Sequence, residues 1–140
     1  MYLLDTNVIS ELRKRKPHGA VTAWIESLGD SDIRIPAVAV AELQDGAEIT
    51  RRQDRAKAIE LEQWIDRVMA TFVVLPMDGS MFRDWARLMS GKPDDLAADA
   101  MIAVTARAHQ LIVATRNVKD FASFGVQVFD PFSGKQSKGI

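Results

Sequence analysis

The sequence contains no cysteine and only two histidines, His18 and His109, among its 140 residues. Without cysteine the chain has no disulfide bond, no thiolate zinc site, no iron–sulfur cluster and no cysteine nucleophile. Two histidines are also too few for a metal site built from several imidazoles. Oxygen-bearing side chains, above all carboxylates, are therefore the groups left for metal binding or catalysis.

A basic excess and a long apolar run are also missing. The chain has 18 Lys and Arg against 19 Asp and Glu, so its net charge gives no sign of a nucleic-acid partner, and contact with a polyanion must come from local basic patches. No apolar run reaches the ~18 residues of a membrane span. The first residues, Met1 to Asp5, lack the basic region of a signal peptide. We therefore predict a cytoplasmic protein without membrane contact.

Short apolar runs alternate with segments of helical period along the chain. The runs predict buried strands at 2–4, 33–35, 71–75, 111–114 and 126–129, and the periodic segments predict helices around 21–28, 37–50, 61–69, 81–89 and 96–109. Such alternation implies crossover connections and a mainly parallel sheet covered on both faces. The predicted fold class is α/β in one domain, residues 1–132. Residues 133–140 lack an apolar pattern and are predicted to form a disordered tail.

Four of the 19 acids stand in strand-end or apolar contexts, namely Asp5, Glu42, Asp99 and Asp120. Asp5 and Asp120 follow predicted strands, whose carboxyl ends border the ligand crevice of open parallel sheets. Glu42 and Asp99 lie in very apolar helical stretches, where a carboxylate without a partner is costly. Three of these acids also have a structural alternative. Asp5 is then a helix cap or turn residue, Asp99 is paired with Arg116 or Lys119, and Asp120 caps a helix.

One parallel α/β layer can bring these four acids into a single crevice. Two like charges ~4 Å apart repel by roughly 4 kcal/mol at an effective dielectric near 20, so several ionised carboxylates need compensation. A hard divalent cation supplies it, and oxygen-only ligation favours Mg²⁺ or Mn²⁺. Such an ion activates water and stabilises charge on a phosphoryl group.

Four short motifs resemble those of a known family. They are Leu4-Asp5-Thr6-Asn7-Val8-Ile9-Ser10, Ala41-Glu42-Leu43 with Gly46, Ala98-Asp99-Ala100-Met101-Ile102-Ala103, and Thr115-Arg116-Asn117 leading to Asp120-Phe121. In this order and at these spacings, over nearly the whole chain, they resemble PIN domains. Within that family the chain is similar to the VapC-type toxins of bacterial toxin–antitoxin pairs, and most of all to the FitB-like branch.

The resemblance implies a three-layer α/β/α sandwich with about five strands and a Mg²⁺-dependent endoribonuclease, with Mn²⁺ as a substitute ion. Asp5 and Asp99 are the implied direct metal ligands, and Glu42 helps to hold a second ion or a water. The family often has a fourth acid at or near the position that Asn117 occupies in this sequence. Because Asn117 is not an acid, Asp120 either takes the place of that fourth acid or only caps a helix. The implied partners that orient the carboxylates are Thr6, Asn7, Thr115 and Asn117.

The resemblance also implies RNA as substrate, a homodimer and a small antitoxin protein that covers the site. Local basic residues are the candidates for contact with RNA, or else are ordinary solvated charges: Arg13, Lys14, Arg15, Lys16, Arg116 and Lys119. Three tryptophans, Trp24, Trp64 and Trp85, fall on apolar helix faces and serve either the core or a dimer or antitoxin groove.

Two other functions compete with the nuclease. A haloacid-dehalogenase-like phosphatase also has an aspartate after its first strand, but it needs a second aspartate two residues later, where this sequence has Asn7. A catalytically silent PIN-like module that binds RNA or a partner is the stronger rival. The intact set of Asp5, Glu42 and Asp99 favours an enzyme over this module.

Overall fold

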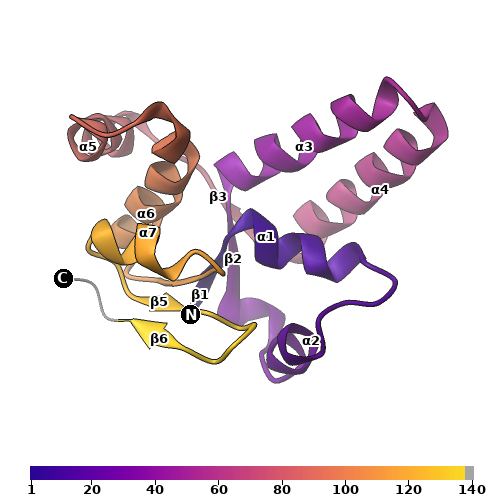
Figure 1. Ribbon diagram of the computed structural model, residues 1–140, viewed down its shortest axis with the longest axis horizontal. Coiled ribbons are helices and arrows are strands. Elements are labelled where there is room, and N and C mark those ends of the chain that lie inside the picture. Colours follow the sequence, from indigo (N-terminus) through magenta and orange to yellow (C-terminus); the bar gives the residue numbers. More distant parts are fainter. Residues whose placement is uncertain (138–140) are drawn as a thin grey trace.

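A computed structural model describes residues 1–137 of the chain (Figure 1). Across these residues six strands form one sheet in the order β3-β2-β1-β4-β5-β6. The strands are β1 (Tyr2–Leu4), β2 (Ile33–Pro36), β3 (Val73–Leu75), β4 (Ile112–Ala114), β5 (Val128–Phe129) and β6 (Gln136–Ser137). From β3 to β5 neighbouring strands run parallel, whereas β6 is antiparallel to β5. The predicted α/β class with a mainly parallel sheet of about five strands is confirmed, with one antiparallel edge strand added.

Helices connect the strands and cover both faces of the sheet. Those described are α1 (Thr6–Ile9), α2 (Gly19–Glu26), α3 (Ala37–Arg51), α4 (Arg55–Thr71), α5 (Gly79–Met89), α6 (Ala97–His109) and α7 (Val118–Ser123), together with the short 3-10 turns η1 (Ser10–Arg13), η2 (Asp30–Asp32) and η3 (Asp94–Leu96). In Figure 1, α1 to α4 lie on one side of the sheet and α5 to α7 on the other. The predicted three-layer α/β/α arrangement is therefore confirmed.

Two hydrophobic clusters fill the space between the sheet and its helices. Leu3 packs with residues of α6 and α7, whereas Leu4 packs with α1, α2 and α3 on the opposite face. Val113 and Ala114 of β4 divide between the two clusters in the same way. Successive side chains of a strand point to opposite faces, so strands with apolar residues at both positions are buried between two layers.

The end of the described chain forms a turn and a short edge strand. Asp130 closes a turn, because its carboxylate accepts hydrogen bonds from the Phe132 N–H (2.8 Å) and the Ser133 hydroxyl (2.9 Å). The turn returns the chain to the sheet, where Gln136 pairs with Phe129. The structure describes residues 136 and 137 as strand β6, because the polar turn closed by Asp130 returns the chain to β5, while the disordered tail of 133–140 stays a prediction. For residues 138–140 the prediction lies outside the described residues.

The helices of residues 1–137 differ from membrane spans. Within this described range, no helix has both the length and the apolar character needed to cross a bilayer.

Candidate active site

Asp5 lies where the carboxyl ends of two neighbouring strands meet. It follows β1 directly, and its N–H donates to the carbonyl of Ala114 at the end of β4 (2.9 Å). Thr115 continues β4 in the same direction, so its side chain reaches Asp5 across 110 residues of sequence. The Thr115 hydroxyl donates to Asp5 Oδ2 at 2.7 Å. The order of the strands, with β1 beside β4, thus creates this contact.

The Asp5 carboxylate is almost completely enclosed, with 4% of the residue's surface exposed. Its Oδ1 accepts a hydrogen bond from the Thr6 N–H (2.7 Å), and its Oδ2 accepts a second one from Asn7 Nδ2 (3.1 Å). Asp5 is also the N-cap of α1, so the capping role is real but uses one of its oxygens only. Burial raises the pKa of Asp5 above its ordinary value, and the negative charge of Glu42 raises it further. The hydrogen bonds from Thr115, Thr6 and Asn7 lower this pKa, but they do not offset the effect of burial.

Glu42 approaches the same edge from α3. Its side chain is exposed, and its Oε1 accepts a hydrogen bond from the Thr6 hydroxyl at 2.7 Å. Thr6 therefore binds Asp5 through its backbone N–H and Glu42 through its side chain. This one residue sets the relative positions of the two carboxylates.

Asp99 lies in the first turn of α6, partly buried. Its own burial is the largest factor that raises its pKa, to about 6, followed by the negative charges of Asp5, Asp120, Glu42 and Asp95. All four acids therefore lie close enough to Asp99 for their charges to act on it. Within the described residues neither Arg116 nor Lys119 forms an ion pair with Asp99. The structural alternative for Asp99 is therefore not supported.

Asp120 and Asn117 take different places at the start of α7. Asn117 is the N-cap residue of the helix, and Asp120 lies inside the first turn. The alternative that Asp120 caps the helix is therefore wrong, and its charge instead affects Asp99. The Asn117 N–H donates to the Thr115 hydroxyl at 2.9 Å, which orients that hydroxyl toward Asp5.

The predicted basic residues separate into two groups beside the acids. Arg13 lines a cavity that Glu42 also lines, and Lys14, Arg15 and Lys16 follow it as exposed residues. Arg116 and Lys119 line a second cavity of about 460 Å³ together with Asp120. Of these six residues, Arg13, Arg116 and Lys119 line cavities that also contain an acid of the candidate site.

Two residues that support these cations were not found from the sequence. Glu11 is buried, 5% exposed, and accepts hydrogen bonds from Lys14 and from the His18 N–H. Phe132 packs under Arg116, whose guanidinium carbon lies 3.7 Å from the ring centroid. The i, i+3 spacing of Glu11 and Lys14 was an available signal for the first contact. No local sequence pattern predicts the contact between Arg116 and Phe132, because the two residues come from separate loops.

The tryptophans also differ in their surroundings. Trp24 packs against Tyr2 and Phe129 in the core, with ring centroids 4.9 and 5.2 Å away. The Trp85 indole N–H donates to the carbonyl of Ala97 at 2.9 Å. Trp64 lines the cavity that contains Arg13. Core packing therefore accounts for Trp24 and Trp85, while Trp64 also faces an accessible space.

The donor set at this edge suits a divalent cation. Asp5, Glu42, Asp99 and Asp120 provide only oxygen atoms, and burial and mutual repulsion disfavour the ionised forms of Asp5 and Asp99. As the side chains of residues 1–137 are placed, no three carboxylate or imidazole groups stand close enough to hold an ion. A bound cation would favour the ionised forms of these carboxylates and offset their mutual repulsion.

Asp99→Asn is expected to stabilise the metal-free protein at neutral pH. The folded-state pKa of about 6 exceeds the ordinary 3.8, so between these values the folded state binds more protons, and stability falls as pH rises. The shift corresponds to at most about 3 kcal/mol, of which solvent screening at this partly exposed site leaves about 1 kcal/mol. Urea unfolding with EDTA should show this gain at pH 7.5 and none at pH 3.5. A gain of equal size at both pH values would contradict the electrostatic cause, and Asp94→Asn, an exposed acid of η3, is the matched control.

Comparison with known proteins gives consistent matches over most of the chain. Residues 2–126 match the model of the PIN domain family. The chain is 38% identical to the toxin FitB of Neisseria gonorrhoeae, over 94% of this chain and 99% of the relative. It is also 38% identical to the VapC ribonuclease Y4jK of Sinorhizobium fredii, over 94% and 98%.

Solved structures agree with these sequence matches. The crystal structure of FitAcB from Neisseria gonorrhoeae superposes with a TM-score of 0.83 at 36% identity, over 94% of this chain and 99% of that one. A toxin–antitoxin complex from Klebsiella pneumoniae gives a TM-score of 0.70 at 26% identity, over 94% and 98%.

Proposed function

The chain belongs to the PIN domain family, as a VapC-type toxin, and from this premise we propose that it is a metal-dependent endoribonuclease that hydrolyses RNA phosphodiester bonds. The observation that supports the proposal is the chain of contacts around Asp5, which accepts a hydrogen bond from Thr115 at the end of β4 and is linked through Thr6 to Glu42. The negative charges of Asp5, Glu42 and Asp120 raise the pKa of Asp99, which has no ion-pair partner among the described residues. A ribonuclease named among its relatives supports the choice of RNA as substrate. Family membership also excludes the phosphatase alternative.

Asp5 and Asp99 would hold a Mg²⁺ ion directly, with Mn²⁺ as substitute, and Glu42 would help to hold a second ion or a water. Asp120, whose charge affects Asp99, would take the fourth acidic position in place of Asn117. When bound, such an ion lowers the pKa of a water ligand and neutralises charge on the phosphoryl oxygens. The chain itself contributes oxygen ligands whose charges repel one another until the cation neutralises them.

The neighbouring polar residues would keep these carboxylates in position. Thr115 and Asn7 hold one oxygen of Asp5, and Thr6 holds one oxygen of Glu42. Asn117 in turn orients the Thr115 hydroxyl. Groups that orient metal ligands in this way commonly change metal affinity or activity about 10- to 100-fold when removed. We assign Thr6, Asn7, Thr115 and Asn117 this orienting role.

RNA would approach along the two groups of cations that border the acids. Arg13 lines the cavity that contains Glu42, and Arg116 and Lys119 line the cavity that contains Asp120. Stacking on Phe132 restricts the Arg116 guanidinium while its donors remain exposed. Each phosphate contact adds favourable counterion release, so RNA binding should weaken as salt increases.

Chelation of divalent ions tests the proposed activity. The purified protein, freed of any partner, is expected to cleave RNA with Mg²⁺ or Mn²⁺ and to lose this cleavage in EDTA, because the acids alone offer no cation to the phosphate. The measurement is gel analysis of a labelled RNA, with Mg²⁺ added back after chelation as the control. Undiminished cleavage in EDTA would reject the metal mechanism. Absence of cleavage with either ion would favour the catalytically silent module.

The proposed partners are a small antitoxin protein and a second copy of the chain. A structure similar to this chain is a toxin–antitoxin complex, which supports an antitoxin as partner. The homodimer and the cytoplasmic location stay predictions from the family resemblance and from the sequence.

A further inference from the structure

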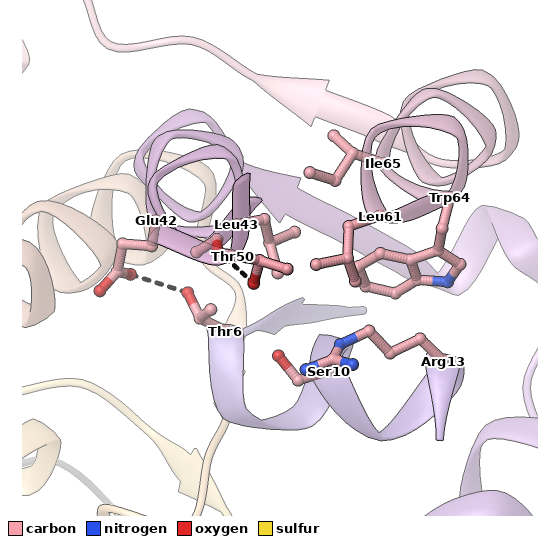
Figure 2. A pocket seen from close by; sticks show the side chains of 10 residues that line it. Thr6, Ser10, Arg13, Glu42, Leu43, Thr50, Leu61, Trp64 and Ile65 are labelled. Carbon is pink, nitrogen blue, oxygen red and sulfur yellow. Dashed lines mark hydrogen bonds between the residues drawn. The ribbon is translucent and has the colours of Figure 1, made fainter. Parts of the chain in front are cut away.

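A cavity of about 150 Å³ opens beside the candidate active site (Figure 2). Its walls come from α1, η1, α3 and α4, and they include Ser10, Arg13, Thr50 and Trp64. Thr6 and Glu42 also line this cavity, and their side chains are hydrogen-bonded to each other at 2.7 Å. The cavity is therefore continuous with the acids that would bind the metal.

The walls combine the indole ring of Trp64, the Arg13 guanidinium, the hydroxyl groups of three residues and the aliphatic side chains of Leu43, Leu61 and Ile65. Of the three hydroxyl groups, that of Thr6 already donates to Glu42, which leaves Ser10 and Thr50 for an occupant. Figure 2 shows Leu61 and Trp64 of α4 across the cavity from Ser10 and Arg13 of η1. Arg13 is exposed and forms no ion pair within the part of the chain that the structure describes. The Thr50 hydroxyl donates to the carbonyl of Gly46 at 3.0 Å, so its oxygen is left as an acceptor.

These are the groups with which proteins hold an unstacked RNA base. Bases stack on aromatic rings or guanidinium planes, and their edges form hydrogen bonds with polar side chains. A purely apolar side chain of a protein partner would fill the cavity without using the guanidinium or the hydroxyls. The chemistry of the walls therefore favours a base over such a side chain.

The size and position of the cavity restrict its occupant further. Sites that enclose a drug-sized ligand have about 300 to 1,000 Å³, so a cavity of about 150 Å³ accepts one planar base and leaves the sugar and phosphate outside. Because Glu42 and Thr6 belong to both the cavity and the candidate active site, the occupant is adjacent to the bond that is cut.

We propose that this cavity binds the base of one nucleotide that flanks the scissile phosphodiester, and that it thereby sets the nucleotide preference of cleavage. Trp64 provides the stacking surface, while Arg13, Ser10 and Thr50 contact the edge of the base. The inference rests on the proposed ribonuclease activity and adds a specificity site to it.

Sequencing the ends of cleaved fragments from a randomised RNA library tests this inference. Wild-type protein with Mg²⁺ should show enrichment of particular nucleotides at one position next to the cut. Arg13→Gln and Ser10→Ala should each reduce that enrichment at least threefold, because they remove contacts to the base edge. Trp64→Leu should reduce cleavage of the preferred RNA by roughly 5- to 100-fold, the range expected for the loss of one base stack. Arg67→Gln, an exposed charge of α4 outside the cavity, is the matched control and should keep the wild-type profile.

The outcomes separate this inference from the proposed function. Wild-type cleavage with the same nucleotide profile in all three cavity variants overturns the base site and leaves the ribonuclease proposal intact. Absence of wild-type cleavage rejects the ribonuclease proposal and the base site with it. Circular dichroism and melting curves of each variant identify any loss caused by unfolding, and Trp64→Phe, which retains a ring for stacking, should recover most of the activity that Trp64→Leu loses.

Discussion

Asp99→Asn is expected to reduce metal-dependent RNA cleavage by roughly 10³-fold or more. The substitution removes a negative ligand from the point where the charges of Asp5, Glu42 and Asp120 converge. A metal ion in such a site contributes several kcal/mol to stabilising the charge of the transition state, and each ~1.4 kcal/mol corresponds to a tenfold change in rate. The initial rate of cleavage of a labelled RNA at saturating Mg²⁺ measures the effect.

The same variant should fold at least as well as the wild type, which separates lost chemistry from lost structure. The neutral amide introduced by Asp99→Asn lacks the charge that the neighbouring acids repel, so the metal-free variant should unfold at a higher urea concentration at neutral pH. Asp94→Asn changes an exposed acid five residues earlier and should cleave at the wild-type rate. Wild-type cleavage by Asp99→Asn would remove this residue from the metal site.

Asp5→Ala is expected to abolish the thermal stabilisation of the protein by Mn²⁺. At a Mn²⁺ concentration of about 100 times its Kd, binding stabilises the folded state by about 2.7 kcal/mol, which raises the melting temperature of a protein of this size by roughly 8–10 °C. The variant lacks the most deeply buried of the acidic ligands and should show less than about a third of this shift. Differential scanning fluorimetry without RNA measures the result independently of catalysis.

The baseline stability of Asp5→Ala needs its own control. Its melting temperature without metal will fall, because Thr115 and Asn7 lose the acceptor of their hydrogen bonds. The quantity to compare is therefore the Mn²⁺-induced shift of each protein. Asp30→Ala alters an exposed acid in η2 and should keep the full shift. Equal shifts for Asp5→Ala and the wild type would mean that the ion binds elsewhere.

Much of the candidate site could be predicted because its acids interrupt local patterns. Asp5 ends an apolar run, which predicts the carboxyl end of a strand. Glu42 and Asp99 interrupt apolar helical stretches where a carboxylate is unfavourable without a partner. These signals are local, since they depend on neighbours within about one helical turn or one strand. The same local patterns predicted the alternation of strands and helices and therefore the fold class.

Other features could not be predicted, because they depend on contacts between distant residues. The bond from Thr115 to Asp5 exists only because β4 lies beside β1. The support of Arg116 by Phe132 requires a chain that turns at Asp130, just before the segment that the sequence predicts as a disordered tail. The cavity beside Glu42 depends on how α4 packs across from η1.

The sequence by itself determined the fold class, the family and the three acids Asp5, Glu42 and Asp99 as candidate ligands, because backbone geometry links the spacing of apolar residues to each helix and strand. Only the tertiary structure placed Asn117 at the N-cap position and Asp120 in the first turn of α7, and brought Arg13 and Trp64 to one cavity with Glu42. It also brought Asp120 near enough for its charge to raise the pKa of Asp99. The physical reason is that pKa values and cavities arise from burial and from charges brought together through space. Those distances are set by the packing of whole elements.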